Sequence, residues 1–260
     1  MSEIPPAGTQ AVGRALGVLG ALAASSGELS SGAIAVELGL SSGTTHRIIR
    51  ALMADDLVAR NSQTDRYHLS SGSVLLGQAA QRNFGIDKML PVLEELNVET
   101  SESVNLSIRN GTESVVMVRV QSTLPLRFEQ RPGARFPLYA TASGKAILAM
   151  SPHVEMYLKT LPRRLRKVTP YTLDTPDELA RELQETRERG YSIDEQENVE
   201  GVRCVGAPVL DRDGCAQAAL VIQVPSVRLP KSRMRSLGER LVLAAEQAAQ
   251  FIPVNRSISR

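Results

Sequence analysis

The sequence predicts an α+β protein with an N-terminal winged helix-turn-helix, a connecting helix, and a larger domain of antiparallel strands and helices. Three observations predict this fold. Two short helical patterns meet at Gly39 and are followed by two short strand patterns. Two strand-like runs flank Asn110-Gly111, the strongest short hairpin signal in the chain. Two further apolar runs flank residues 211–214, which predicts a second hairpin.

The N-terminal segment precedes a single amphipathic helix. Residues 1–8 contain Pro and Gly, and we expect them to be disordered. The helix should run from about Thr9 to Ala24, because apolar residues recur on one face. Its stretch LGVLGALAAS is similar to the apolar part of a signal peptide, but residues 1–13 contain Glu3 and no Lys or Arg. No apolar run is long enough to span a bilayer, so we expect no membrane partner, and the presence of only two cysteines fits a reducing cytoplasm.

The stretch from Ile34 to Leu57 carries the helix-turn-helix pattern. In AIAVELGL, apolar residues recur at helical spacing and Gly39 ends the run. Leu40 should be buried in the turn, and Ser41 or Ser42 can cap the next helix. That helix has an inward stripe of Thr45, Ile48, Ile49 and Leu52. Its outer face, which in a recognition helix reaches base edges and phosphates, consists of Ser42, Thr44, His46, Arg47 and Arg50.

The next segment predicts the wing. Residues 58–69 are two short strands around a polar turn, with Arg60 and Arg66 at its base, where they can neutralise phosphate. An ordinary helical hairpin with a solvated Arg47 and Arg50 is the alternative. The wing and the absence of any acidic residue between Glu37 and Asp55 favour double-stranded DNA as the partner.

The overall composition is that of an ordinary globular protein and does not by itself indicate a DNA-binding surface. The chain has 260 residues, is 42% hydrophobic and carries a net charge of +2. Residues 1–84 contain six arginines and six acidic residues, so only the local charge distribution points to DNA. Two cysteines and three histidines are too few for a disulfide scaffold or a structural zinc site. We expect no cofactor and no metal.

The rest of the chain divides at a connector. A helical pattern over 71–84 separates a DNA-binding domain at 1–70 from a second domain at 85–260. Gly85 breaks the connector, and an amphipathic helix follows it. The elements expected after that helix are strands at 103–110 and 114–120, a strand at 126–130, a helix opening at Ser143, a charged helix at 175–189 ended by Gly190, two strands around 211–214, and a helix at 231–251.

The last hairpin separates two chemically different faces. Whether its loop has two or four residues, Cys204, Gly206 and Pro208 share a face with Val221 and Gln223. The opposite face is purely aliphatic and should pack on helices, which leaves the face with Cys204 and Gln223 to meet something less apolar. Cys204 and Cys215 lie too far apart along the ladder to form a disulfide, and Pro208 predicts a free or irregular strand edge.

The sequence as a whole resembles the IclR (isocitrate lyase regulator) family of bacterial transcription factors. The resemblance rests on GRALGVLGAL, LGLSSGTTHRIIRAL, RYHLSSGSVLLG, RPGARFPLYATASGKAILAM and GYSIDEQENVEGVRCVGAPVLDRDG in this order. It implies a winged helix-turn-helix, a linker helix and a GAF-like effector-binding domain. It also implies a homodimer or homotetramer that binds a palindromic operator and responds to a small organic acid.

The resemblance implies an effector pocket. Ala142 and Ser143 match a helix N-terminus whose N–H groups and dipole favour a carboxylate, and Gly144 would allow close approach. Asp194 and Cys204 match polar contacts. The matches to the apolar wall are Phe128, Phe136 and Val202, and on the alternative interpretation the two Phe are core residues. Val221 and Gln223 stand where serines are common, and this departure together with the two Phe suggests a more apolar or aromatic carboxylic acid than the shortest keto acid.

In the DNA domain the resemblance matches Thr44, His46 and Arg47, with Ser42 and Gly43 at positions that often carry other residues. Gly43 weakens its helix by about 0.5–1 kcal/mol relative to Ala. Arg14 resembles a first-helix arginine that contacts phosphate, and a solvated helix-face charge is the equal alternative.

Other features have simpler interpretations. An enzyme using Cys204 is the main rival function, but the thiol would need a base, and the three histidines lie elsewhere. Asp194, Glu195, Glu197 and Glu200 could suggest a metal site and are more typical of a solvated acidic loop. The run Arg163, Arg164, Arg166 and Lys167 is expected to be an exposed loop. The sequence therefore predicts a ligand-responsive transcriptional regulator and leaves open a regulator without an effector.

Overall fold

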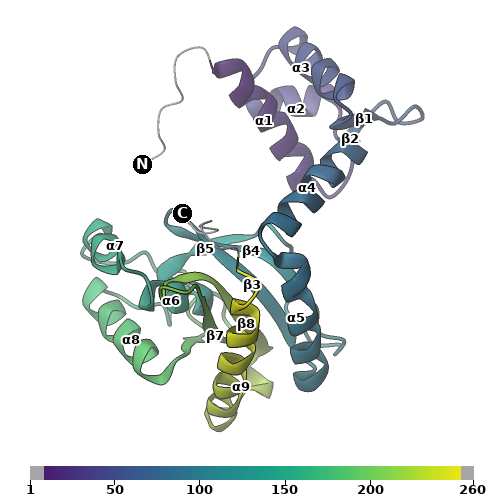
Figure 1. Ribbon diagram of the computed structural model, residues 1–260. Helices are drawn as coiled ribbons and strands as arrows, with labels where there is room; N and C mark the ends of the chain where they lie inside the picture. The colour runs from purple at the N-terminus through teal and green to yellow at the C-terminus, as the bar shows by residue number, and fades with distance from the viewer. Residues whose placement is uncertain (1–8, 253–260) are drawn as a thin grey trace. The chain divides into compact units, whose positions relative to one another are not determined.

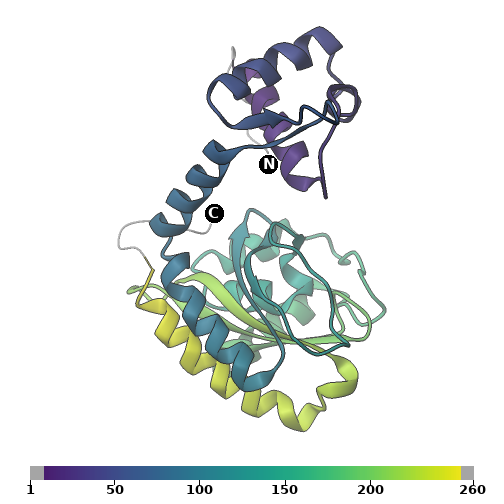
Figure 2. The same ribbon diagram turned by 90° about the vertical axis from the view of Figure 1, so that its right-hand side faces the viewer.

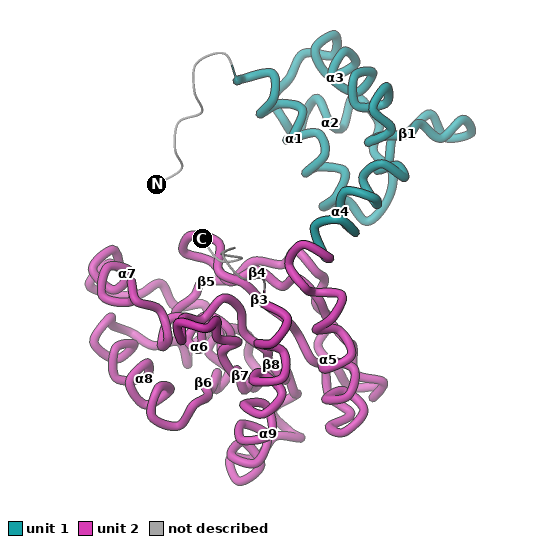
Figure 3. The backbone as a smooth tube through the Cα atoms, in the orientation of Figure 1, with its two compact units in different colours: residues 1–81 teal, residues 82–260 magenta. Residues whose placement is uncertain are grey.

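The computed structural model describes residues 9–252 and separates the chain into two compact units (Figure 3). The units comprise residues 1–81 and 82–260, and each is considered by itself. The disorder expected for residues 1–8 lies outside the described residues. Within residues 9–252, no helix combines the length and the apolar character that crossing a membrane requires.

The first unit is three helices, a two-stranded sheet and the start of a fourth helix (Figure 1). Its elements are α1 (Gln10–Ala24), α2 (Ser31–Leu38), α3 (Ser42–Ala54), β1 (Val58–Arg60), β2 (Tyr67–Leu69) and α4 (Ser71–Asn83). The strands pair antiparallel, and Leu29 adds an isolated bridge to Tyr67. The two helices, the turn and the wing predicted from the sequence are therefore confirmed.

Local signals set the ends of the two central helices. Ser30 caps α2 by accepting a hydrogen bond from the Ala33 N–H at 3.1 Å. Gly39 ends α2 with a φ of 61°, a backbone conformation that glycine adopts without a steric penalty. Ser41 then caps α3 through the Thr44 N–H at 3.3 Å. The helices bury a common core of Val18, Leu22, Ile34, Ile49, Leu52, Val58 and Tyr67.

The second unit is a six-stranded antiparallel sheet with helices on both faces (Figure 1). Its strands are β3 (Ser103–Asn110), β4 (Glu113–Val120), β5 (Arg135–Pro137), β6 (Ser192–Glu195), β7 (Val202–Leu210) and β8 (Ala216–Pro225), in the order β5-β4-β3-β8-β7-β6. Its helices are α5 (Ile86–Thr100), α6 (Ala142–Ala149), α7 (Val154–Thr160), α8 (Pro176–Arg189) and α9 (Lys231–Ala249), with short 3-10 turns at Leu138–Ala140 and Ser226–Arg228.

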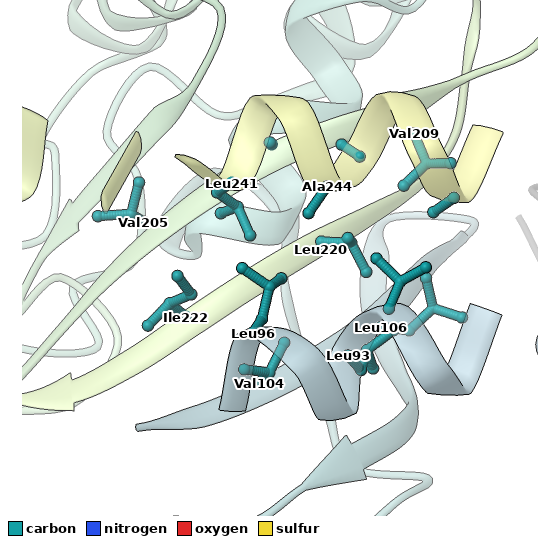
Figure 4. Close-up of a cluster of buried hydrophobic side chains, with 14 of the residues drawn as sticks. Leu93, Leu96, Val104, Leu106, Val205, Val209, Leu220, Ile222, Leu241 and Ala244 are labelled. Carbon is teal, nitrogen blue, oxygen red and sulfur yellow. The ribbon is translucent and has the colours of Figure 1, made fainter. Parts of the chain in front are cut away.

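The two faces of this sheet differ as the parity argument predicts. Cys204 pairs with Gln223 and Gly206 with Val221, so these residues share one face. The aliphatic face packs against α5 and α9, which lie side by side on it (Figures 2 and 4). The buried side chains labelled there include Leu93, Leu96, Val104, Leu106, Val205, Leu220, Ile222 and Leu241. Helix α6 covers the other face, against β7 and β8.

The strand expected at 126–130 is absent, and this prediction was wrong. Leu126 is 58% exposed, and its carbonyl accepts from Arg228 at 2.7 Å. The Phe128 carbonyl accepts from Arg119, so side chains rather than a neighbouring strand satisfy this backbone. The edge strand is instead β5, whose Phe136 pairs with Ser114 on β4.

Two features at the other edge explain how the sheet ends. Strand β6, which the sequence analysis did not identify, pairs with β7 only from Arg203 to Gly206. Pro208 lies beyond that pairing, so its missing N–H faces a free edge, as predicted.

Helix α8 begins with a capping box between Thr175 and Glu178 and ends at Gly190, which confirms the predicted charged helix.

Candidate functional sites

The outer face of α3 is a charged, solvent-exposed surface. Thr45, Ile49 and Leu52 are buried against the unit's core, and this orientation turns the opposite side of the helix outward. Ser42, His46, Arg47 and Arg50 are exposed there. Thr44 is half-buried, and its hydroxyl accepts a hydrogen bond from Ser41 at 2.9 Å. This geometry presents the predicted contact residues together.

One of the two wing arginines forms an ion pair within the wing, which the sequence did not predict. Arg60 forms an ion pair with Asp65 across the turn, so part of its charge is neutralised internally. Glu28 accepts hydrogen bonds from Asn61 and Thr64, each at 2.6 Å, which ties the turn to the segment before α2. Arg66 is exposed. Of the two wing arginines, Arg66 is therefore the freer to meet a phosphate.

A groove in the same unit runs along α1 beside the turn of the helix-turn-helix. Arg14 is half-buried there, next to Leu38, Gly39 and Leu40. Gly13 and Gly17 of α1 also line the groove. The predicted phosphate contact thus lies beside the chain turn that leads into α3.

A cavity in the second unit lies between α6 and the polar face of the sheet. Its open space is about 30 Å³, and it is lined by Asn105, Ser107, Val116, Gln130, Phe136, Thr141, Ala142, Ser143, Asp194, Asn198, Cys204, Val221 and Gln223. That space corresponds to about two water molecules. Phe128 and Val202 pack with Ala142, Cys204 and Val221 in the adjoining apolar cluster. Most of the residues predicted from the family resemblance therefore surround one cavity.

The N-terminus of α6 supplies hydrogen-bond donors to this cavity. Thr141 caps the helix by accepting from the Gly144 N–H at 3.1 Å. Ala142 and Ser143 both line the cavity, and within residues 9–252 their N–H groups have no acceptor. The first N–H groups of a helix carry partial positive charge, so they can bind an anion. The Ser143 hydroxyl is held by Ser114 at an Oγ to Oγ distance of 2.7 Å.

Two glycines allow α6 to pack closely against its neighbours. A Cβ on Gly144 would lie 2.1 Å from the carbonyl oxygen of Leu138. A Cβ on Gly206 would lie 2.8 Å from the carbonyl oxygen of Ala142. Gly144 does not line the cavity, so its role in the structure is close packing with the preceding turn rather than an approach to a ligand.

The acidic segment from Asp194 to Glu200, which begins in β6, was interpreted as a solvated loop, and that interpretation was wrong for two of its carboxylates. Asp194 is 3% exposed and Glu197 is 6% exposed. Glu197 pairs with the fully buried Lys145, whose Nζ lies 2.6 Å from Glu197 Oε1. The Asp194 carboxylate accepts from the Glu197 N–H at 2.7 Å. Burial, and then the charge of Glu197, raise the pKa of Asp194 to about 7.

Cys204 is a buried thiol without an activating base. Burial and the neighbouring Asp194 raise the pKa of Cys204 well above its usual value, which is opposite to what a nucleophile needs. His153 stands exposed at the N-terminus of α7, and the other two histidines belong to the first unit. Both cysteines are free. Among the described residues, no group of His, Cys, Asp and Glu side chains is arranged to hold a metal ion.

Strands β3 and β4 contribute polar side chains that were not among the residues predicted from the sequence. Ser103, Asn105 and Ser107 lie on the cavity side of the sheet, and Arg119 of β4 pairs with Asn105 across the strands. Their signal was available: these polar residues alternate with the aliphatic Val104, Leu106 and Ile108 along one strand. The pairing of Lys145 with Glu197 had no such signal, because the two residues are far apart in the sequence.

Comparisons with known proteins agree across nearly the whole chain. Residues 79–250 match the model of the bacterial transcriptional regulator IclR C-terminal domain, and residues 11–62 match the IclR helix-turn-helix domain. The chain is 34% identical to the HTH-type transcriptional repressor AllR of Escherichia coli over 89% of this chain and 86% of AllR. It is 32% identical to the HTH-type transcriptional regulator BhcR of Paracoccus denitrificans over 92% and 86% of the two chains. The crystal structure of the Thermotoga maritima IclR superimposes with a TM-score of 0.76 at 28% identity, covering 92% and 97%.

Proposed function

The chain belongs to the IclR family of bacterial transcriptional regulators, and on that premise we propose how its two units divide the work. The first unit binds an operator through α3 and the wing, and the second unit binds a small carboxylic acid that changes the affinity for DNA. The observation that carries this proposal is the pair of unbonded N–H groups of Ala142 and Ser143 at the cavity.

The DNA-binding part of the proposal rests on the outer face of α3. Ser42, Thr44, His46 and Arg47 lie in the N-terminal half of this helix, the half that reaches base edges in helix-turn-helix proteins. Arg50 and Arg66 are exposed nearby in sequence and would neutralise phosphates, with smaller contributions from Arg14 and the partly neutralised Arg60. We place the regulator in the cytoplasm, where it meets DNA.

The operator should be a palindrome bound by two copies of the chain. Paired recognition helices enter successive major grooves about 34–36 Å apart, so the half-sites should have matching spacing. The finer choice between a homodimer and a homotetramer is measurable by light scattering of the protein with and without operator DNA.

The effector should present a carboxylate to α6. The N–H groups of Ala142 and Ser143 would bind its oxygens, and Phe136, Val202 and Val221 would contact its carbon skeleton. The cavity is small, so a short acid fits with modest side-chain movement, whereas an aromatic acid would require Phe128 or Phe136 to move. An acid regulates DNA binding only if it binds the DNA-competent and the incompetent conformations with different affinities.

One experiment tests both parts. Fluorescence anisotropy would measure binding of the full chain to its own upstream intergenic DNA, across a salt series and with a panel of short carboxylic acids. We expect binding that weakens steeply with salt, resists competitor DNA, and is shifted by at least one acid. Specific binding that no acid changes would contradict the effector proposal, and the absence of specific binding would contradict the DNA-binding proposal.

A further inference from the structure

Arg119 of β4 donates hydrogen bonds to three amide side chains of the cavity wall. Its Nη1 donates to Gln223 Oε1 at 2.7 Å, to Asn105 Oδ1 at 3.2 Å and to Gln130 Oε1 at 3.3 Å. Its Nη2 donates to Ser103 Oγ at 3.0 Å and to the Phe128 carbonyl. All three amides line the cavity, whereas Arg119 itself stands behind them.

This arrangement fixes which atoms of the amides a ligand can meet. A guanidinium has only hydrogen-bond donors, so each amide must turn its oxygen toward Arg119. The NH₂ groups of Asn105, Gln130 and Gln223 then remain, and within residues 9–252 none of them donates to another protein group. This end of the cavity therefore offers donors, and it suits a ligand group that only accepts hydrogen bonds.

The guanidinium of Arg119 adds a positive charge behind these hydrogen-bond donors. Every acceptor that contacts Arg119 is neutral, and its buried Nε has no partner in the described part of the chain. The acidic side chain with the largest effect on the pKa of Arg119 is Glu129, which accepts hydrogen bonds from Gln121 at 2.7 Å and from Arg127 at 3.0 Å. A guanidinium stays protonated in proteins, so its positive charge is available to an anion at this end.

We propose that Arg119 is a positioning residue that makes the effector cavity selective for short diacids. One carboxylate binds the N–H groups of Ala142 and Ser143, and the second accepts from the NH₂ groups that Arg119 orients, those of Gln223, Asn105 and Gln130. This inference rests on the proposed function of the cavity and specifies its ligand class. The small cavity favours the shortest diacids, because they require the least movement of side chains at its wall.

The test compares diacids with monoacids of equal carbon number. Isothermal titration calorimetry of the full chain would use malonate against propionate and succinate against butyrate. We expect the better diacid to bind about tenfold or more tightly than its partner, because its second carboxylate accepts charge-assisted hydrogen bonds that the methyl end of the monoacid cannot make. Equal affinities within a pair would overturn the proposal.

Variants then assign the selectivity to Arg119. In Arg119→Met we expect the diacid preference to fall to about threefold or less while monoacid binding changes little. Arg127→Met is the matched control, because Arg127 pairs with Glu129 and contacts none of the three amides, so the preference should persist. A diacid preference that survives Arg119→Met would overturn the assignment.

A second variant decides the question if Arg119→Met does not fold. Gln223→Glu keeps the shape and the contact with Arg119 but replaces a donor with an anionic acceptor, so diacid binding should fall about tenfold or more. Unchanged diacid binding would contradict the role of the oriented NH₂ group. The DNA assay separates the two proposals: acids that shift operator binding without distinguishing mono- from diacids refute this inference alone, whereas acids that neither bind nor shift it refute both.

Discussion

The DNA-facing helix and the interior of the second unit hold their charges in opposite ways. On α3, His46, Arg47 and Arg50 are exposed, and within residues 9–252 they form no ion pair. In the interior of the second unit, Lys145 and Glu197 are buried and form an ion pair with each other. Exposed charges can be exchanged at little cost in folding free energy, whereas buried charges are part of the fold. Changes at α3 should therefore affect binding alone, and changes near α6 should affect stability as well.

The largest expected effect is at the buried ion pair. Lys145→Met leaves Glu197 buried without its cation, and we expect a loss of about 3–5 kcal/mol in the free energy of unfolding. Urea denaturation monitored by circular dichroism would measure it. Lys167→Met is the control, since Lys167 pairs with Asp174 at the surface, with side chains 46% and 45% exposed, and should cost less than about 1 kcal/mol. Similar losses in the free energy of unfolding of the two variants would contradict the distinction between buried and exposed ion pairs.

The second effect concerns pH. The pKa of Asp194 is raised from 3.8 to about 7 in the folded state, so the folded protein keeps a proton that the unfolded chain releases. This contribution to stability is present below pH 4 and is lost as the pH rises from 4 to 7. The Asp194→Asn side chain cannot ionise, so the stability of this variant relative to the wild type should rise by about 4 kcal/mol across that range. Parallel stability curves from pH 4 to 8 would show that Asp194 has an ordinary pKa.

The third effect contrasts two glycines. Gly144→Ala places a methyl group against the Leu138 backbone and should cost about 2 kcal/mol or more. Gly43→Ala meets nothing within 4 Å on α3 and should stabilise the first unit by about 0.5–1 kcal/mol. Thermal unfolding of both variants measures the difference, and a change of the same sign in both would be inconsistent with it.

The smallest effect on folding stability is expected for Arg47→Ala, a substitution that should clearly weaken DNA binding. Arg47→Ala should change the free energy of unfolding by less than about 0.5 kcal/mol. It should weaken specific operator binding by about 1–3 kcal/mol and non-specific binding much less. Anisotropy titrations with operator and with scrambled DNA check this, and equal losses on both would assign Arg47 to phosphate rather than to bases.

The first unit was predictable because its signals are local. Gly39, the serine caps and the stripe through Thr45 and Ile49 each act within a few residues, and the structure contains all of them. The parity of the last hairpin was equally local, and it identified the face of Cys204 and Gln223 before the register was known.

The cavity was only partly predictable, because its decisive contacts join distant segments. Arg119 reaches Gln223 on β8, and Lys145 reaches Glu197, and no periodicity in one strand or helix encodes either contact. The strand expected at 126–130 failed for the same reason. Its apolar residues alternate as a strand would, but Arg119 and Arg228 occupy its carbonyl groups.

The small size of the cavity sets the timing of the response. Because the open space is about 30 Å³, the proposed acid would bind only after side chains at the cavity wall move, and the same movement would precede its release. Association should then be slower than diffusion, and residence on the protein should be long. A regulator of this kind keeps its occupied state for a time after the metabolite has been consumed, so that transcription follows the recent average of the acid rather than its momentary concentration.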